Sequence, residues 1–115
     1  MEITNKSKEL VLSFLEALNE EDFEKAKECL NNDFIFRGPM GERNGAGEYI
    51  EDMKKMKFKY KIEKAFSLGE DVCIIYEIDM SGKAKIPTSG LYHLDNGKIS
   101  SLKVFFDPRP ILKNK

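Results

Sequence analysis

The chain has 115 residues, of which 19 are basic and 20 acidic, giving a net charge of −1. This length fits one domain spanning residues 1–115, and an apolar content of 41% is too high for a disordered chain. Because the lysines are interspersed with glutamates, the sequence has no basic stripe of the kind that binds nucleic acid. We therefore expect a folded protein that does not bind nucleic acid.

The cysteines and the single histidine do not suggest a metal site. Cys29 and Cys73 are far apart and form no C-x-x-C pair, and His93 is the only histidine. We expect two buried free thiols, no metal and no cofactor. The longest apolar run, Val72 to Tyr76, is too short to cross a membrane, and the polar first residues do not resemble a signal peptide. The reducing cytoplasm is the expected location.

The first part of the chain has the spacing of amphipathic helices. The first helix is predicted from apolar residues at i, i+3, i+4 and i+7, which are Val11, Phe14, Leu15 and Leu18. A second, shorter helix is expected from about Asp22 to Asn31, with Phe23, Ala26 and Leu30 on one face. The two helices would form a hairpin with a very short turn.

A strand and a third helix follow, and then an almost purely β pattern. The strand is predicted over residues 33–37 and the helix over about 47–56. From Lys57 onward, four strands are separated by turn signals at residues 69–71, 81–82 and 95–97. The order α-α-β-α-β-β-β-β indicates an α+β fold. An antiparallel sheet with three helices on one face tends to curl around them and to leave a cavity.

Three segments resemble the nuclear transport factor 2-like superfamily. They are Phe14 to Asn19 followed by Asp22, Asp33 to Phe36 followed by Gly38-Pro39, and Asn96 to Ile99 leading to Phe105-Phe106-Asp107. This superfamily includes ketosteroid isomerases, SnoaL-type polyketide cyclases and limonene epoxide hydrolases. The resemblance covers nearly the whole chain and implies a cone-shaped fold, but such motifs specify a fold better than an activity.

In that cone, alternate strand residues point inward, and the helices contribute a few more side chains. The resulting pocket lining is expected to be largely apolar and to suit a small apolar or aromatic molecule. The predicted lining comprises Phe14, Phe34, Phe36, Tyr49, Met53, Ile74, Tyr76, Ile78, Ser89, Leu91, His93, Leu102, Val104 and Phe106.

The resemblance also allows one activity to be argued against. The first-helix tyrosine of ketosteroid isomerases would fall on Phe14, their catalytic base on Gly38 and their acid donor on Ser89. None of these residues can supply the required group, so steroid isomerisation of that type is not expected.

SnoaL-type cyclases use an Asp and a His from late strands, and His93 and Asp107 are the candidates here. With Tyr76 as a hydroxyl donor, they form a candidate acid–base set for a cofactor-free isomerase, cyclase or hydratase. Counting by twos places His93 inward but Asp107 outward unless a bulge resets the last strand. Each also has a structural interpretation, His93 as a hydrogen-bonded core residue and Asp107 as a turn cap paired with Arg109.

Two further features concern the surface of the sheet. Lys64 interrupts an alternating apolar pattern, which indicates either a pocket lysine or, more often, a β-bulge or an extended surface side chain. The outward phase of the late strands contains Ile75, Leu94 and Phe105, which suggests a homodimer formed through this face. Besides a ligand-binding protein and an acid–base enzyme, a third hypothesis is therefore a dimeric association module with a vestigial pocket.

Overall fold

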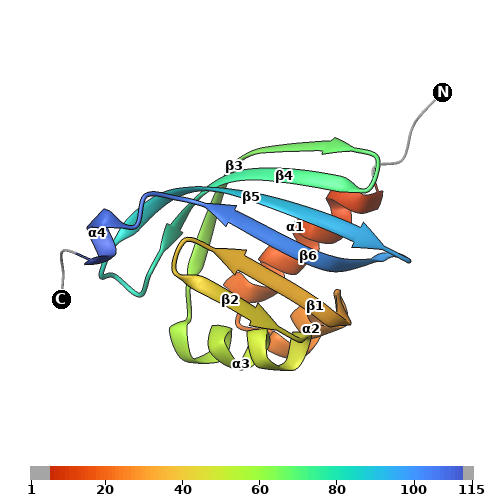
Figure 1. Ribbon diagram of the computed structural model, residues 1–115, viewed down its shortest axis with the longest axis horizontal. Coiled ribbons are helices and arrows are strands. Elements are labelled where there is room, and N and C mark those ends of the chain that lie inside the picture. Colours follow the sequence, from red (N-terminus) through yellow and green to blue (C-terminus); the bar gives the residue numbers. More distant parts are fainter. Residues whose placement is uncertain (1–5, 113–115) are drawn as a thin grey trace.

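The computed structural model describes residues 6–112 of the chain. Three helices and a strand hairpin come before the four long strands that form most of the sheet (Figure 1). In the described residues, no helix is long and apolar enough to span a membrane. The elements are α1 (Lys6–Asn19), α2 (Phe23–Glu28), β1 (Leu30–Gly38), β2 (Gly41–Asn44), α3 (Ala46–Met56), β3 (Lys59–Leu68), β4 (Asp71–Asp79), β5 (Lys85–Asp95), β6 (Lys98–Phe105) and α4 (Arg109–Leu112).

Helix α1 buries the predicted apolar stripe and is fastened to the sheet at its end. Val11, Phe14 and Leu15 are fully buried, because their spacing places them on one face of the helix. At the last residue, the Asn19 side-chain amide donates to the Tyr60 carbonyl oxygen (2.9 Å), and Asn19 Oδ1 accepts from the Tyr60 backbone N–H (2.7 Å). These two bonds fix the position of Tyr60 on β3.

Helix α2 is shorter than predicted. Its start is as expected, because the Asp22 side chain accepts a hydrogen bond from the Lys25 backbone N–H (3.2 Å). The helix ends at Glu28, however, and Leu30 begins β1, where it is paired with Ile99 of β6. The prediction that Leu30 continues the helix was wrong because local spacing does not reveal this long-range strand pairing.

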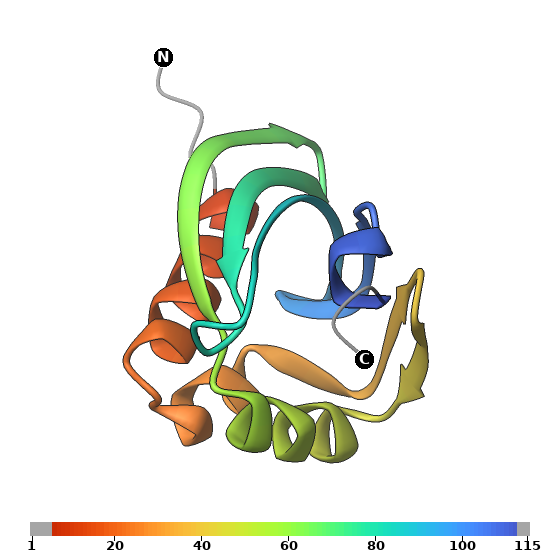
Figure 2. The same cartoon turned by 90° about the vertical axis from the view of Figure 1, so that its left-hand side faces the viewer.

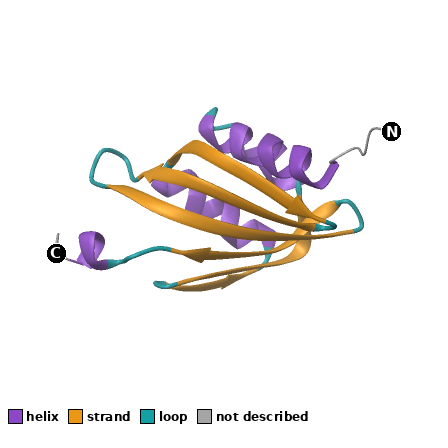
Figure 3. Cartoon of the chain, turned by 90° about the horizontal axis from the view of Figure 1, so that it is seen from above, coloured by secondary structure: helices purple, strands orange, loops and turns teal. Residues whose placement is uncertain are grey.

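The six strands form one curved sheet in the order β2-β1-β6-β5-β4-β3. Strand β1 runs parallel to β6, and all other neighbours are antiparallel. The sheet curls around helices that lie on its concave side, with α1 against β3 and β4 and α3 against β1 and β2 (Figures 2 and 3). This is the α+β cone expected from the sequence.

Two elements were not predicted. Strand β2 has the sequence Gly-Glu-Arg-Asn, with no apolar residue, and all four residues are exposed. It exists because the turn after β1 folds the chain back so that Gly38 pairs with Gly41. The short helix α4 follows Pro108, after the last strand. Neither carries a periodic apolar pattern that would reveal it in the sequence.

On β5 the prediction chose the wrong face. Leu91 and His93 were expected to point inward, but both are exposed, whereas Tyr92 and Leu94 are buried. The reason is the antiparallel register with β4, which places Tyr92 opposite the buried Val72. Cross-strand partners share a face of the sheet, so this register fixes the orientation of the whole strand.

Lys64 follows a bulge in β3. The pairing of β3 with β4 shifts register between Ile62 and Lys64, which is the structural interpretation that the sequence favoured. Beyond the bulge, Phe66 and Leu68 become exposed on the sheet, at 57% and 84%. Lys64 itself is also exposed and does not line the pocket.

Candidate functional site

A pocket of about 510 Å³ lies between α3, the β1–β2 hairpin and the concave face of the sheet. Its wall is mostly apolar. Aliphatic side chains come from β4 and β6, namely Ile78, Leu102 and Val104. The aromatic side chains come from almost every neighbouring element, and they are Phe36, Tyr49, Phe58, Tyr60, Tyr76 and Phe106.

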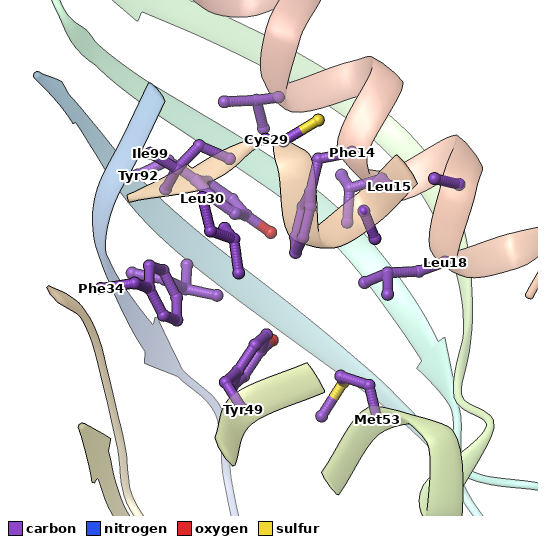
Figure 4. Close-up of a cluster of buried hydrophobic side chains, with 14 of the residues drawn as sticks. Phe14, Leu15, Leu18, Cys29, Leu30, Phe34, Tyr49, Met53, Tyr92 and Ile99 are labelled. Atoms are coloured by element: carbon purple, nitrogen blue, oxygen red, sulfur yellow. The ribbon is translucent and has the colours of Figure 1, made fainter. Parts of the chain in front are cut away.

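All four tyrosines of the chain gather in or directly behind this wall. Tyr49, Tyr60 and Tyr76 line the pocket, and Tyr92 lies behind Tyr76, with the two hydroxyl oxygens 2.8 Å apart. The rings of Tyr60 and Tyr76 are in contact, with centroids 5.5 Å apart. Figure 4 shows Tyr49 projecting from α3 into the protein interior, opposite Tyr92. The pocket thus has phenol hydroxyls within an otherwise apolar lining.

These hydroxyls remain protonated at neutral pH. Burial raises the pKa of Tyr49, Tyr60, Tyr76 and Tyr92 well above the usual value for a phenol. The Tyr49 and Tyr60 hydroxyls are hydrogen-bonded to each other, and the Tyr60 hydroxyl is also 3.5 Å from the Met53 sulfur. The four tyrosine hydroxyls can therefore donate hydrogen bonds but cannot readily release their protons.

Methionines form a further part of the wall. Met40, Met53, Met56 and Met80 all line the pocket, and the fifth methionine, Met1, lies outside the described residues. Met40 and Met56 are partly exposed, whereas Met53 is buried. Because methionine is flexible and polarisable, this lining can adapt to ligands of different shapes.

An ion pair between β2 and α3 supplies most of the charge in the pocket wall. Arg43 Nε donates to Asp52 Oδ2 at 2.6 Å and Arg43 Nη2 donates to Asp52 Oδ1 at 2.9 Å. Arg43 Nη1 is also 3.5 Å from a carboxylate oxygen of Glu48. The hydrogen bonds from Arg43 lower the pKa of Asp52, so this carboxyl is ionised at neutral pH although its side chain is only 19% exposed.

Comparison with known proteins agrees with this architecture. Residues 11–102 match the model of the SnoaL-like domain. The chain is 54% identical to an NTF2-like protein of unknown function from Cytophaga hutchinsonii, with a TM-score of 0.90 and 97% of each chain covered. The chain belongs to the SnoaL-like domain family of the NTF2-like superfamily. A search of curated proteins finds no match to this SnoaL-like chain.

More distant structures share the fold. An LEH-like epoxide hydrolase from M. tuberculosis is 22% identical, with a TM-score of 0.81, covering 96% of this chain and 89% of the other. A protein from Shewanella putrefaciens assigned as a SnoaL-like polyketide cyclase is 18% identical, with a TM-score of 0.79, covering 96% and 85%. At these identities the likeness concerns the fold of the SnoaL-like domain.

The pocket of this SnoaL-like chain contains many of the residues expected to line it. Three others belong to the core behind the pocket, where Phe14, Phe34 and Ile74 are completely buried. The expected residues that do line it are Phe36, Tyr49, Met53, Tyr76, Ile78, Leu102, Val104 and Phe106.

The remaining expected residues lie outside the pocket. On the convex side of β5 lie Ser89, Leu91 and His93, because pairing with β4 turns the alternate residues of β5 inward. His93 Nδ1 is 2.7 Å from Asp71 Oδ1 at the surface, and this hydrogen bond raises the pKa of the imidazole. Asp107 is exposed and accepts hydrogen bonds from Arg109. His93, Asp107 and Tyr76 are therefore not brought together around one cavity.

The three positions compared with ketosteroid isomerases also have clear structural roles. Phe14 is in the core, Ser89 is on the outer face, and Gly38 lines the pocket. A Cβ atom at Gly38 would lie 2.8 Å from Cγ2 of Val104, so a longer side chain does not fit there without movement. Phenol groups reach the pocket from other elements, because Tyr49, Tyr60 and Tyr76 come from α3, β3 and β4.

The ion pair is the part of the site that the sequence did not reveal. Arg43 was missed because β2 itself was not predicted. Asp52 did carry a signal, since it follows Tyr49 by three residues on a predicted helix and therefore lies near the inward face. No group of three or more His, Cys, Asp or Glu that could hold a metal is present among residues 6–112.

Proposed function

We propose that this chain binds a small, largely apolar or aromatic molecule in the pocket. The observation that carries the proposal is a cavity of about 510 Å³ with an apolar and aromatic wall and a few hydroxyl groups. Small-molecule sites typically combine such a wall with a small number of polar groups that orient the ligand. The pocket is not filled by the protein's own side chains, which argues against a purely vestigial cavity.

The tyrosines indicate how such a ligand would be oriented. The Tyr76 and Tyr92 hydroxyls carry two protons, and only one can lie between their oxygens. When Tyr92 donates to Tyr76, the Tyr76 proton is free to bond a carbonyl or hydroxyl oxygen of the ligand. An apolar molecule with one uncharged oxygen therefore fits the wall better than a pure hydrocarbon.

Binding of 2-naphthalenemethanol, measured by isothermal titration calorimetry and thermal shift, tests the proposal. At a ligand concentration one hundred times Kd, binding should stabilise the fold by about 2.7 kcal/mol. Ile78→Trp fills the pocket with an indole and should abolish binding, whereas Glu77→Trp, at the next position on β4 and outside the pocket, should not. If the alcohol does not bind, or if Ile78→Trp binds it normally, the proposal fails.

Catalysis in the same pocket is a second candidate, because a carboxylate and phenols line one cavity. Asp52 can accept a proton or orient water, and the tyrosines can donate to a developing oxyanion. This set replaces His93 and Asp107 as the candidate for cofactor-free isomerase, cyclase or hydratase chemistry. Turnover of a bound ligand that disappears in Asp52→Asn would support it.

We also propose that the convex face of the sheet pairs with a second copy of the chain. Strand register places Phe66, Cys73 and Leu91 side by side across three strands, and Phe105 lies in the adjacent row with Ile75. Phe66, Leu91 and Phe105 are 57%, 39% and 54% exposed, and exposed apolar side chains gathered on one face of a sheet are typical of an interface. Leu94, expected on this surface, is instead buried in the core.

Cys29 is buried as expected, but Cys73 is only half-buried on the convex face, and both are free thiols. The cytoplasm, where thiols remain reduced, is the compartment that we propose for the chain.

A further inference from the structure

The charges in the pocket wall are unequal in sign. Among the described residues that line the pocket, Glu42 and Asp52 are carboxylates and Arg43 is the cation. Lys55 also acts electrostatically on Asp52, but it is exposed on α3 and does not line the pocket. Glu42 is 3.7 Å from Arg37, an exposed residue outside the lining, so the Arg43–Asp52 pair is the main charged feature that a ligand meets.

The one cation of the wall is already engaged. Two donor atoms of Arg43 bind Asp52, and a third lies 3.5 Å from Glu48. The two Arg43 N–H groups that face Asp52 are occupied, so a ligand carboxylate could bind only through the remaining N–H groups, in competition with Glu48, or by displacing Asp52. Displacing Asp52 would leave its partly buried carboxylate without its partner, which is unfavourable. Binding beside the intact pair would bring the ligand carboxylate near the Asp52 and Glu42 carboxylates while two Arg43 donors stay engaged.

On this basis, and resting on the proposed ligand-binding function, we propose that the Arg43–Asp52 pair makes the pocket selective against anionic ligands. The pocket takes hydrophobic molecules whose polar group is uncharged or positively charged, and it rejects carboxylates of the same size and shape. Asp52 is the residue that determines this selectivity, because it both repels an anion and occupies the guanidinium that would otherwise attract one.

Three naphthalene derivatives of nearly equal size test the selectivity at pH 7.5. They are 2-naphthalenemethanol, which is neutral, 2-naphthylmethylamine, which is a cation, and 2-naphthoate, which is an anion. Calorimetry on the unmodified chain should give similar Kd values for the alcohol and the amine, and a Kd for the carboxylate that is larger by about tenfold or more.

Variants of the pair then assign the effect to Asp52. Asp52→Asn removes the repelling charge and frees the two Arg43 donors, so the affinity for 2-naphthoate relative to that for the alcohol should rise by about tenfold. Glu51→Gln is the matched control, since it removes the same charge from the preceding residue, which is exposed, paired with Lys54 and absent from the pocket wall. Arg43→Gln provides a second variant and should weaken naphthoate binding further.

The outcomes separate the selectivity from the proposed function. If none of the three compounds binds, the proposed function fails, and the selectivity with it. If naphthoate binds as tightly as the alcohol, the selectivity alone is refuted. It is also refuted if Glu51→Gln raises naphthoate affinity as much as Asp52→Asn does, because the effect would then reflect net charge and not the pocket pair.

Discussion

Gly90 is the glycine at which an added Cβ atom would make the closest contact. It faces inward on β5, and a Cβ atom added there would collide with the Tyr76 hydroxyl and lie 3.0 Å from Cε1 of Tyr92. The absent side chain thus makes room for the hydrogen-bonded Tyr76 and Tyr92 hydroxyls. Gly90→Ala should force Tyr76 away from Tyr92, although alanine is the better residue for a strand interior elsewhere.

The expected cost follows from what the added methyl displaces. Overpacking a buried site costs about 1–3 kcal/mol. Tyr76→Phe alone should cost about 1–3 kcal/mol, because it leaves the buried Tyr92 hydroxyl without its partner. In the double variant the Tyr76 hydroxyl no longer blocks the methyl, so adding Gly90→Ala to Tyr76→Phe should cost less than about 1 kcal/mol more.

Urea unfolding of the four proteins measures this coupling directly. The free energies of unfolding should be strongly non-additive, with the double variant more stable than the sum of the two single costs predicts. The m-values should stay equal, since the surface exposed on unfolding is unchanged. Additive costs would show that the Tyr76 hydroxyl does not occupy the space in front of Gly90, and the described packing of the tyrosines would be incorrect.

Two other predictions concern the convex face of the sheet. The imidazole of His93 should titrate in NMR above its ordinary pKa, and Asp71→Asn should bring the pKa back towards about 6.5. Because the pKa of His93 is raised in the folded state, its pairing with Asp71 stabilises the fold fully below the unfolded-state pKa. This stabilisation is lost as pH rises through the folded-state pKa. An unshifted pKa of His93 would contradict the ion pair. Phe105→Glu or Ile75→Glu should convert a dimer into monomers in sedimentation, whereas the exposed Lys83→Glu should not, and a dimer that persists in all variants would exclude this face.

The sequence predicted the elements whose side chains follow a clear period. The α1 stripe from Val11 to Leu18 and the alternating β4 face from Ile74 to Ile78 are buried as their spacing indicated. The apolar residues of α1 share one face. Strand β4 has Cys73 and Ile75 in its other phase, but Glu77 and Asp79 mark that phase as outward, so local sequence was sufficient in both cases.

The sequence predictions failed where the apolar spacing is ambiguous or missing. Strand β5 has apolar residues in both phases, Leu91 against Tyr92 and Leu94, and only its pairing with β4 decides between them. Strand β2 has no apolar residue and is held by its hairpin, so the Arg43–Asp52 pair across β2 and α3 could not be anticipated. The expected pocket role of His93 depended on which face of β5 points inward, and the observed register places His93 on the outer face.

The methionines offer the most direct test of the central claim that the pocket holds a ligand. Met40, Met53, Met56 and Met80 all line the pocket, so their methyl groups report on its contents. Titration of 2-naphthalenemethanol into protein labelled with ¹³C at the methionine methyls should shift these four signals along one binding curve, and Ile78→Trp should suppress the shifts. If the four signals stay in place while the alcohol raises Tm, the ligand binds elsewhere and the pocket is not the functional site.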